Sequence, residues 1–151
     1  MIHYKKTQYS KWMLILVGVL IFIIYSYFFK KGLANLPLIP FILILSILVI
    51  ILALFYKLTL IIDDEKFTAI FGIGWLKKSV LISNIDLSTI EKVTFPWYVG
   101  IGIRLTDKGW LWNTKVGESI YFKSKNKFHS YLFGTDDFEE IKKQLLNYKK
   151  P

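Results

Sequence analysis

The sequence contains no cysteine, which excludes a disulfide framework and a thiolate nucleophile. It has only two histidines, His3 in the N-terminal tail and His129 within a strand pattern, and neither lies in a metal-ligand spacing. Gly100 and Gly102 lack the third glycine and the following helix of a dinucleotide-binding loop, and no Ser, His and Asp signature of a hydrolase is present. We therefore expect no catalytic residue, no metal site and no cofactor, and we predict that the protein is not an enzyme.

Charge is missing from two long segments near the N-terminus. Residues 12–29 and 38–56 contain no Asp, Glu, Lys or Arg. As a helix, the shorter segment spans roughly 27 Å, close to the roughly 30 Å of a bilayer's hydrocarbon core. Trp12, Tyr25 and Tyr56 lie near segment ends, where aromatic side chains favour the membrane interface. The sequence therefore predicts two transmembrane spans in contact with the lipid bilayer, forming a hairpin within residues 1–57. A cleaved signal peptide is the alternative for the first segment, although no small-residue cleavage site follows it.

The net charge of +9 is uneven. Residues 1–56 carry five lysines and no acid, whereas residues 57–151 carry 15 basic and 11 acidic residues. Lysines that flank apolar segments indicate headgroup contact and topology, so we expect no nucleic-acid partner. Four of these lysines lie on the side of the two chain ends: Lys5, Lys6, Lys11 and Lys57. Only Lys30 and Lys31 lie on the side of the loop. This bias predicts that the N-terminus and the C-terminal domain are cytoplasmic.

Residues 58–151 have the pattern of a β-rich domain. Short alternating segments bounded by turn residues indicate seven or eight antiparallel strands. At the end of the chain, apolar residues recur at helical spacing, at Phe138, Ile141 and Leu145. They predict an amphipathic helix over 136–147, for which the preceding Thr135-Asp136-Asp137 provides an N-cap and an acidic first turn. The predicted fold class is an α+β membrane protein, with the two-helix transmembrane hairpin followed by an antiparallel β-barrel of about seven strands that the helix caps.

Several motifs resemble those of the bacterial PH-like domains. They are GIRLTDKGWLWN over residues 102–113, ESIYFKS after it, and FGTDDFEEIKKQL over residues 133–145. The resemblance covers roughly residues 57–147 and implies a PH-like barrel, often preceded in that family by two transmembrane helices. Most members have no known function, and some related proteins of Gram-positive bacteria protect their producer from bacteriocins. Because the shared motifs are structural, the resemblance implies a fold more than an activity.

Aromatic residues between two predicted strands form the first candidate contact site. Phe95, Trp97 and Tyr98 surround Pro96, and aromatic side chains in a loop either dip into a membrane interface or form a hot spot for a partner. The alternative is that they fill the open end of the barrel together with Trp110 or Trp112.

Alternating lysines form the second candidate site. Lys123, Lys125 and Lys127 share one face while their strand continues, which suits anionic lipid headgroups. The alternative is a solvated strand end and turn.

These features together predict a non-enzymatic, membrane-anchored PH-like binding or scaffold module at the cytoplasmic membrane face that engages a protein or peptide partner. One alternative is a protein of bacteriocin immunity or envelope-stress protection. A second is an accessory subunit of a membrane transporter or enzyme complex. A homo-oligomer is compatible with the sequence.

Overall fold

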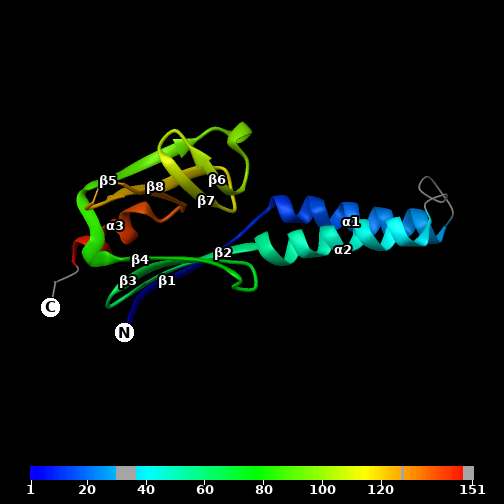
Figure 1. The fold of residues 1–151 in the computed structure, drawn as a ribbon, viewed down its shortest axis with the longest axis horizontal. Coiled ribbons are helices and arrows are strands. Elements are labelled where there is room, and N and C mark those ends of the chain that lie inside the picture. Colours follow the sequence, from blue (N-terminus) through cyan, green and yellow to red (C-terminus); the bar gives the residue numbers. More distant parts are fainter. Residues whose placement is uncertain (30–36, 127, 148–151) are drawn as a thin grey trace.

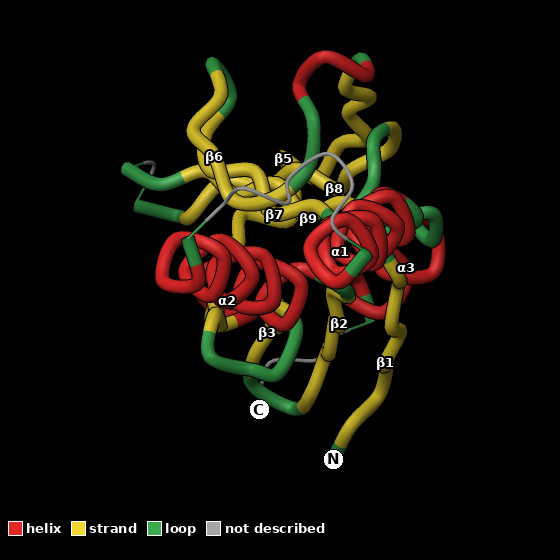
Figure 2. Tube along the Cα trace, turned by 90° about the vertical axis from the view of Figure 1, so that its right-hand side faces the viewer, coloured by secondary structure: helices red, strands yellow, loops and turns green. Residues whose placement is uncertain are grey.

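Two β-sheets and a long helical arm make up the computed structural model, which describes residues 1–29, 37–126 and 128–147. The sheets lie one above the other at one end of the molecule, and the arm projects from that end (Figure 1). The arm consists of α1 (Trp12–Phe28) and α2 (Leu38–Phe55). The two helices run side by side in both views of the backbone, and the rings of Tyr27 and Phe41 stack with their centroids 3.9 Å apart (Figures 1 and 2).

The predicted transmembrane hairpin is wrong in two respects. The chain begins with a strand, and of the described helices only α2, with 18 residues, is long and apolar enough to cross a membrane by length and composition. Helix α1 has 17 residues and falls short of that criterion. Two spans are therefore not supported. The cytoplasmic orientation inferred from flanking lysines depended on them and is withdrawn; Lys30 and Lys31 lie outside the described residues.

The first sheet contains four antiparallel strands in the order of the chain. Its edge strand β1 comes from the N-terminal tail and pairs with β2 from Ile2 opposite Asp63 to Tyr9 opposite Lys57. Strand β1 was not predicted from the sequence, whereas the other three belong to the β-rich domain predicted from residue 58 onward. The strands are β1 (Ile2–Tyr9), β2 (Lys57–Asp63), β3 (Lys66–Phe71) and β4 (Leu76–Leu81).

The second sheet contains five strands in the order β5-β8-β9-β7-β6. A 3-10 turn, η2 (Ile82–Asn84), leads into it from the first sheet. Strand β9 lies between β8 and β7; it pairs antiparallel with β8 and parallel with β7, where Leu111 stands opposite Leu132. The strands are β5 (Ile85–Phe95), β6 (Gly102–Thr106), β7 (Gly109–Asn113), β8 (Gly117–Ser124) and β9 (Ser130–Gly134).

The main core lies between the sheets and under the last helix, α3 (Phe138–Leu146). Phe67 has no exposed surface, and its ring centroid lies 4.8 Å from that of Phe133 and 5.6 Å from that of Phe122. Helix α3 buries the three apolar residues that the helical spacing singled out. Its N-cap residue is Asp137, one of the three residues expected there, although the Asp137 side chain makes no capping hydrogen bond; the acidic residues of the first turn are Glu139 and Glu140.

These observations correct the predicted fold class. The described residues form two sheets with nine strands and one parallel pair, not an antiparallel barrel of about seven strands behind a hairpin. The reason is that the tail strand β1 completes the first sheet, and non-local pairing places β9 between β7 and β8.

Candidate functional site

The segment between β5 and β6 carries the aromatic candidate site. Pro96 lies directly after β5, and the 3-10 turn η3 (Trp97–Val99) follows. Gly100 then adopts φ +72°, and a Cβ atom there would lie 3.2 Å from the Arg104 guanidinium, so both the backbone angle and the space favour glycine. Asn113 donates a 3.0 Å hydrogen bond from Nδ2 to the carbonyl oxygen of Gly100. The loop is therefore fixed against β7.

The structure separates the three predicted aromatic residues. Phe95 is buried in a second, smaller core cluster with Leu111, Tyr121 and Leu132, which includes neither Trp110 nor Trp112. Trp97 and Tyr98 are 76% and 74% exposed, and they do not fill the interior. An exposed pair of aromatic rings on a fixed loop is a surface that a partner or a membrane interface can cover.

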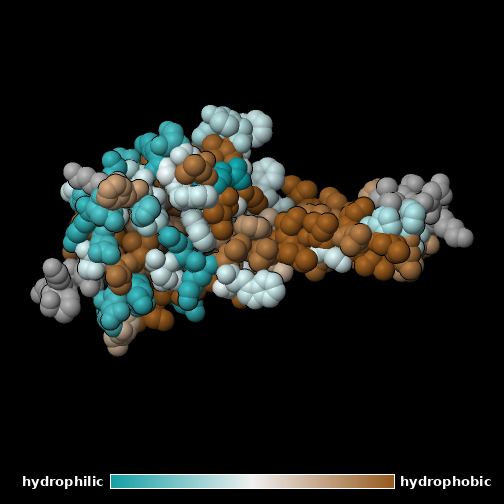
Figure 3. Space-filling model, in the orientation of Figure 1, coloured by the Kyte–Doolittle hydropathy of each residue, from teal (hydrophilic) through white to brown (hydrophobic). Residues whose placement is uncertain are grey.

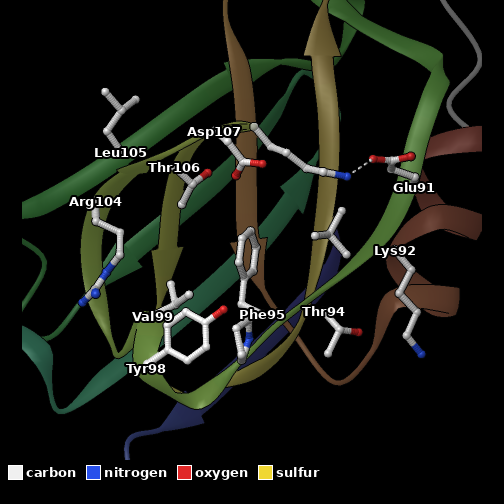
Figure 4. A pocket seen from close by; sticks show the side chains of 13 residues that line it. Glu91, Lys92, Thr94, Phe95, Tyr98, Val99, Arg104, Leu105, Thr106 and Asp107 are labelled. Atoms are coloured by element: carbon white, nitrogen blue, oxygen red, sulfur yellow. Dashed lines mark hydrogen bonds and ion pairs between the residues drawn. The ribbon is translucent and has the colours of Figure 1, made fainter.

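A groove of about 790 Å³ begins beside this loop and runs between the two edge strands of the second sheet, β5 and β6. Figure 4 shows Arg104, Leu105 and Thr106 along one side, and Glu91, Lys92 and Thr94 along the other. Phe95, Tyr98 and Val99 gather at one end. The groove thus has an apolar, aromatic end and polar walls.

Ion pairs and hydrogen bonds shape the groove walls. Lys108 bridges to Glu91 over 3.2 Å, which links the β6–β7 turn to β5. Lys92 pairs with Glu118 at 2.5 Å, so its charge is partly neutralised on the β8 side. Arg104 donates from Nη2 to the carbonyl oxygen of Ile101, while its buried Nε makes no hydrogen bond within the described part of the chain. The lining includes the basic Lys92, Arg104 and Lys108 and the acidic Glu91 and Asp107, so it presents both signs of charge.

This arrangement suits an extended polypeptide. Edge strands present backbone N–H and C=O groups that an added strand can pair with, and alternate side chains of such a peptide enter pockets beside the edge. Leu105 is 69% exposed on the groove wall and offers an apolar contact. No periodic signal in the sequence identified Arg104, Leu105 or Asp107 as site residues, because the approach of β6 to β5 depends on pairing between distant segments.

The lysine candidates lie elsewhere. Lys123 is exposed near the end of β8, where it stands opposite Asp86, and Lys125 is exposed in the following turn. Its backbone N–H donates to the carbonyl oxygen of Asn84 over 2.8 Å. Both lie at the end of the second sheet that points away from the arm (Figure 1). Lys127 lies outside the described residues.

The two histidines are on the surface of the domain. His3 contacts Asp64 with Nε2 at 2.6 Å from Oδ1, and His129 is exposed just before β9. Within residues 1–29, 37–126 and 128–147, no group of three or more His, Cys, Asp or Glu side chains is placed to hold a metal ion.

Comparisons of the chain with known protein families, curated proteins and solved structures find no match. No protein-family model matches the chain, and neither a curated protein nor a solved structure matches it at a significant level.

Proposed function

We propose that the chain is a non-enzymatic binding module, attached to a membrane through its apolar arm, that takes an extended peptide segment of a partner protein in the groove between β5 and β6. The groove itself carries this proposal, because it combines two open sheet edges, an aromatic end and walls of both charges. The resemblance to bacterial PH-like domains stays a prediction.

The exposed apolar surface of the arm supports membrane attachment. Along α2, Ile39, Leu43 and Ile47 are 73%, 57% and 56% exposed, and on α1 Leu14 and Phe22 are 72% and 63% exposed. The space-filling view shows this hydrophobic surface along the arm, in contrast to the mixed surface over the sheets (Figure 3). Apolar area in water costs about 25 cal/mol per Å², so an arm of this composition favours a lipid environment.

The aromatic end and exposed leucine support a peptide ligand. Interface hot spots are enriched in Trp and Tyr, and the exposed Tyr98 lies where the groove ends. Charges of both signs on the walls suit the alternating polar side chains of an extended segment, and electrostatic complementarity then sets its direction. Two strand edges let the peptide backbone supply most of the affinity.

Selection of peptide ligands tests this proposal. The purified full chain in detergent is used to select binders from a displayed library of random peptides, and affinities are measured by fluorescence anisotropy. We expect Leu105→Ser and Tyr98→Ala to weaken the selected peptides by about tenfold or more, as interface hot spots do. Phe128→Ala is the matched control, because Phe128 is 86% exposed and does not line the groove. If no selected peptide depends on Leu105 or Tyr98, the groove is not the binding surface.

Alkaline extraction of cell membranes tests the attachment. We expect the chain to remain with the membrane pellet. Ile47→Lys should shift it to the supernatant, because a lysine at the centre of an inserted helix costs about 2.5–3.5 kcal/mol. Ile47→Ala serves as the control and should stay in the pellet. A wild-type chain that is fully released by alkali contradicts the attachment.

A further inference from the structure

Two pockets meet at the base of the arm, and of these only the apolar one adjoins the peptide groove, with which it shares Tyr98. One has a volume of about 480 Å³ and is lined by Lys6, Gln8, Lys11, Lys115 and Asp136. The other has about 540 Å³ and an almost wholly apolar lining that includes Leu16, Val19, Ile51, Trp97 and Ile101. Trp12, the first residue of α1, lines both pockets. A polar pocket and an apolar pocket thus share one indole ring at the point where the arm leaves the sheets.

Positive charge dominates the polar pocket. Its lining holds three lysines and one carboxylate. Lys115 makes an ion pair with Asp136, and Lys6 pairs with Asp137 at 3.0 Å. Lys11 has no ion pair within the described residues. Burial lowers the pKa of Lys115, and repulsion from Lys6 and Lys11 lowers it further. An anion bound here would offset that repulsion.

The side chain of Gln8 provides a hydrogen-bond acceptor that lacks a donor. It lines the same pocket and is 7% exposed. Its Nε2 donates to the carbonyl oxygen of Gly134 over 3.0 Å, which fixes the orientation of the amide. Its buried Oε1 has no hydrogen-bond partner among the described residues. A fully ionised phosphate carries no hydrogen and cannot donate to that oxygen, whereas a hydroxyl group can.

From these observations we propose that the base of the arm binds one anionic glycerophospholipid with a hydroxylated headgroup, of the phosphatidylglycerol class. The phosphate lies against Lys11 and Lys115, a headgroup hydroxyl donates to Gln8, and an acyl chain occupies the apolar pocket beside Trp97. Trp12 separates the two halves of the ligand, as tryptophan does at a membrane interface. The inference rests on the membrane attachment proposed above, since the lipid comes from the bilayer that surrounds the arm.

Lipid selectivity of the purified full chain tests the site. The chain in a neutral detergent is titrated with dioleoyl phosphatidylglycerol, phosphatidic acid and phosphatidylcholine, and bound lipid is counted by native mass spectrometry. We expect phosphatidylglycerol to bind about tenfold more tightly than phosphatidylcholine and more tightly than phosphatidic acid, which lacks the headgroup hydroxyls. Lys11→Ala/Lys115→Ala should remove this preference. Lys123→Ala/Lys125→Ala removes the same charge at the far end of the sheet and should leave it unchanged.

Each other outcome overturns a stated part of the proposal. Equal binding of phosphatidic acid overturns the role of Gln8. Equal binding of free glycerol phosphate overturns the lipid as ligand, because the apolar pocket then contributes nothing. A chain that stays in the membrane pellet on alkaline extraction but shows no lipid preference overturns the site alone, whereas a chain released by alkali overturns the membrane attachment. Circular dichroism and peptide affinity of the Lys11→Ala/Lys115→Ala variant distinguish lost binding from lost folding, and Lys11→Gln provides a milder second variant with the same expected direction.

Discussion

The Tyr4 hydroxyl donates a 2.9 Å hydrogen bond to Oδ2 of Asp137, which joins the first strand to the N-cap residue of the last helix. The Lys6 ammonium lies 3.0 Å from the same carboxylate oxygen. One carboxylate therefore binds two side chains of β1 at the start of α3. This explains why Asp137 makes no capping bond to α3: its carboxylate binds the neighbouring strand instead.

This carboxylate should make stability depend on pH. Lys6 and then Tyr4 lower the pKa of Asp137 through hydrogen bonds. Because the folded pKa lies below the unfolded one, the stabilisation is complete above about pH 4 and is lost as the pH falls through the folded pKa. We expect Asp137→Asn to lower the melting temperature at about pH 7 and to have much less effect at about pH 3. Thermal denaturation followed by circular dichroism measures this, and an equal effect at both pH values contradicts it.

Tyr4→Phe removes only the hydroxyl group that donates to Asp137. We expect a loss of about 1 kcal/mol at neutral pH, typical of one hydrogen bond, with the strand otherwise retained. Tyr98→Phe is the control, because Tyr98 is exposed on its loop. Chemical denaturation of the two variants in detergent compares the losses. A Tyr4→Phe variant as stable as Tyr98→Phe shows that the contact contributes nothing.

Gly72 is the point where the first sheet touches the arm. It has φ +49°, and a Cβ atom there would overlap the carbonyl oxygen of Ala53 near the end of α2. Its N–H donates to the carbonyl oxygen of Lys57 over 2.9 Å. We expect Gly72→Ala to destabilise the fold by more than Gly74→Ala, which meets a backbone cost of about 1–2 kcal/mol but no clash. Gly74 has φ +101° and its nearest neighbour would lie 3.8 Å away, so the difference in melting temperature isolates the close approach.

Phe67 anchors the core between the sheets. Its truncation in Phe67→Ala should cost about 3–5 kcal/mol, the usual range for a buried phenylalanine. Phe128→Ala removes the same atoms from an 86% exposed position and should change stability little. Denaturant unfolding of both variants checks the contrast. A comparable loss for Phe128→Ala means that the two positions differ less in burial than described.

Local patterns predicted the elements better than their arrangement. Strands β2–β9 and α3 follow from alternation, turn residues and helical spacing. Strand β1 was missed because its sequence, IHYKKTQY, contains few apolar residues and its pairing with β2 forms only after the chain returns from the arm. The parallel pairing of β7 with β9 is equally non-local, and antiparallel pairing is the reasonable expectation for short consecutive strands.

The candidate site was only partly predictable for the same reason. The Phe95–Tyr98 segment could be found because aromatic residues between strands are unusual, but the sequence does not say which ring turns inward. The cluster at the base of the arm forms because β1 joins the first sheet, which brings Gln8 and Lys11 close to Lys115. It was missed because the N-terminal tail was not expected to be part of the domain. Each missed contact depends on residues far apart in the chain.

The arm takes the place of a hairpin turn. Tyr9 stands opposite Lys57, and the N–H of Ser10 donates to the carbonyl oxygen of Tyr56 over 2.9 Å, so the ladder of β1 and β2 continues to the foot of both helices. We expect replacement of residues 10–56 by Asn-Gly to leave a folded domain, since that dipeptide favours the tight turn of a hairpin. Dispersed amide signals in a two-dimensional NMR spectrum check this, and a collapsed spectrum contradicts it.

The same double connection restricts how the domain moves. A domain on one flexible linker samples many orientations. Here the arm is connected to the domain twice, through β1 into α1 and through α2 into β2, and only a few residues separate each strand from its helix. The angle between arm and sheets is therefore set by the twist of a β-ladder. Under the membrane attachment proposed above, a tilt of the arm would turn the groove with it, so the surroundings of the arm would set the direction in which a partner must approach.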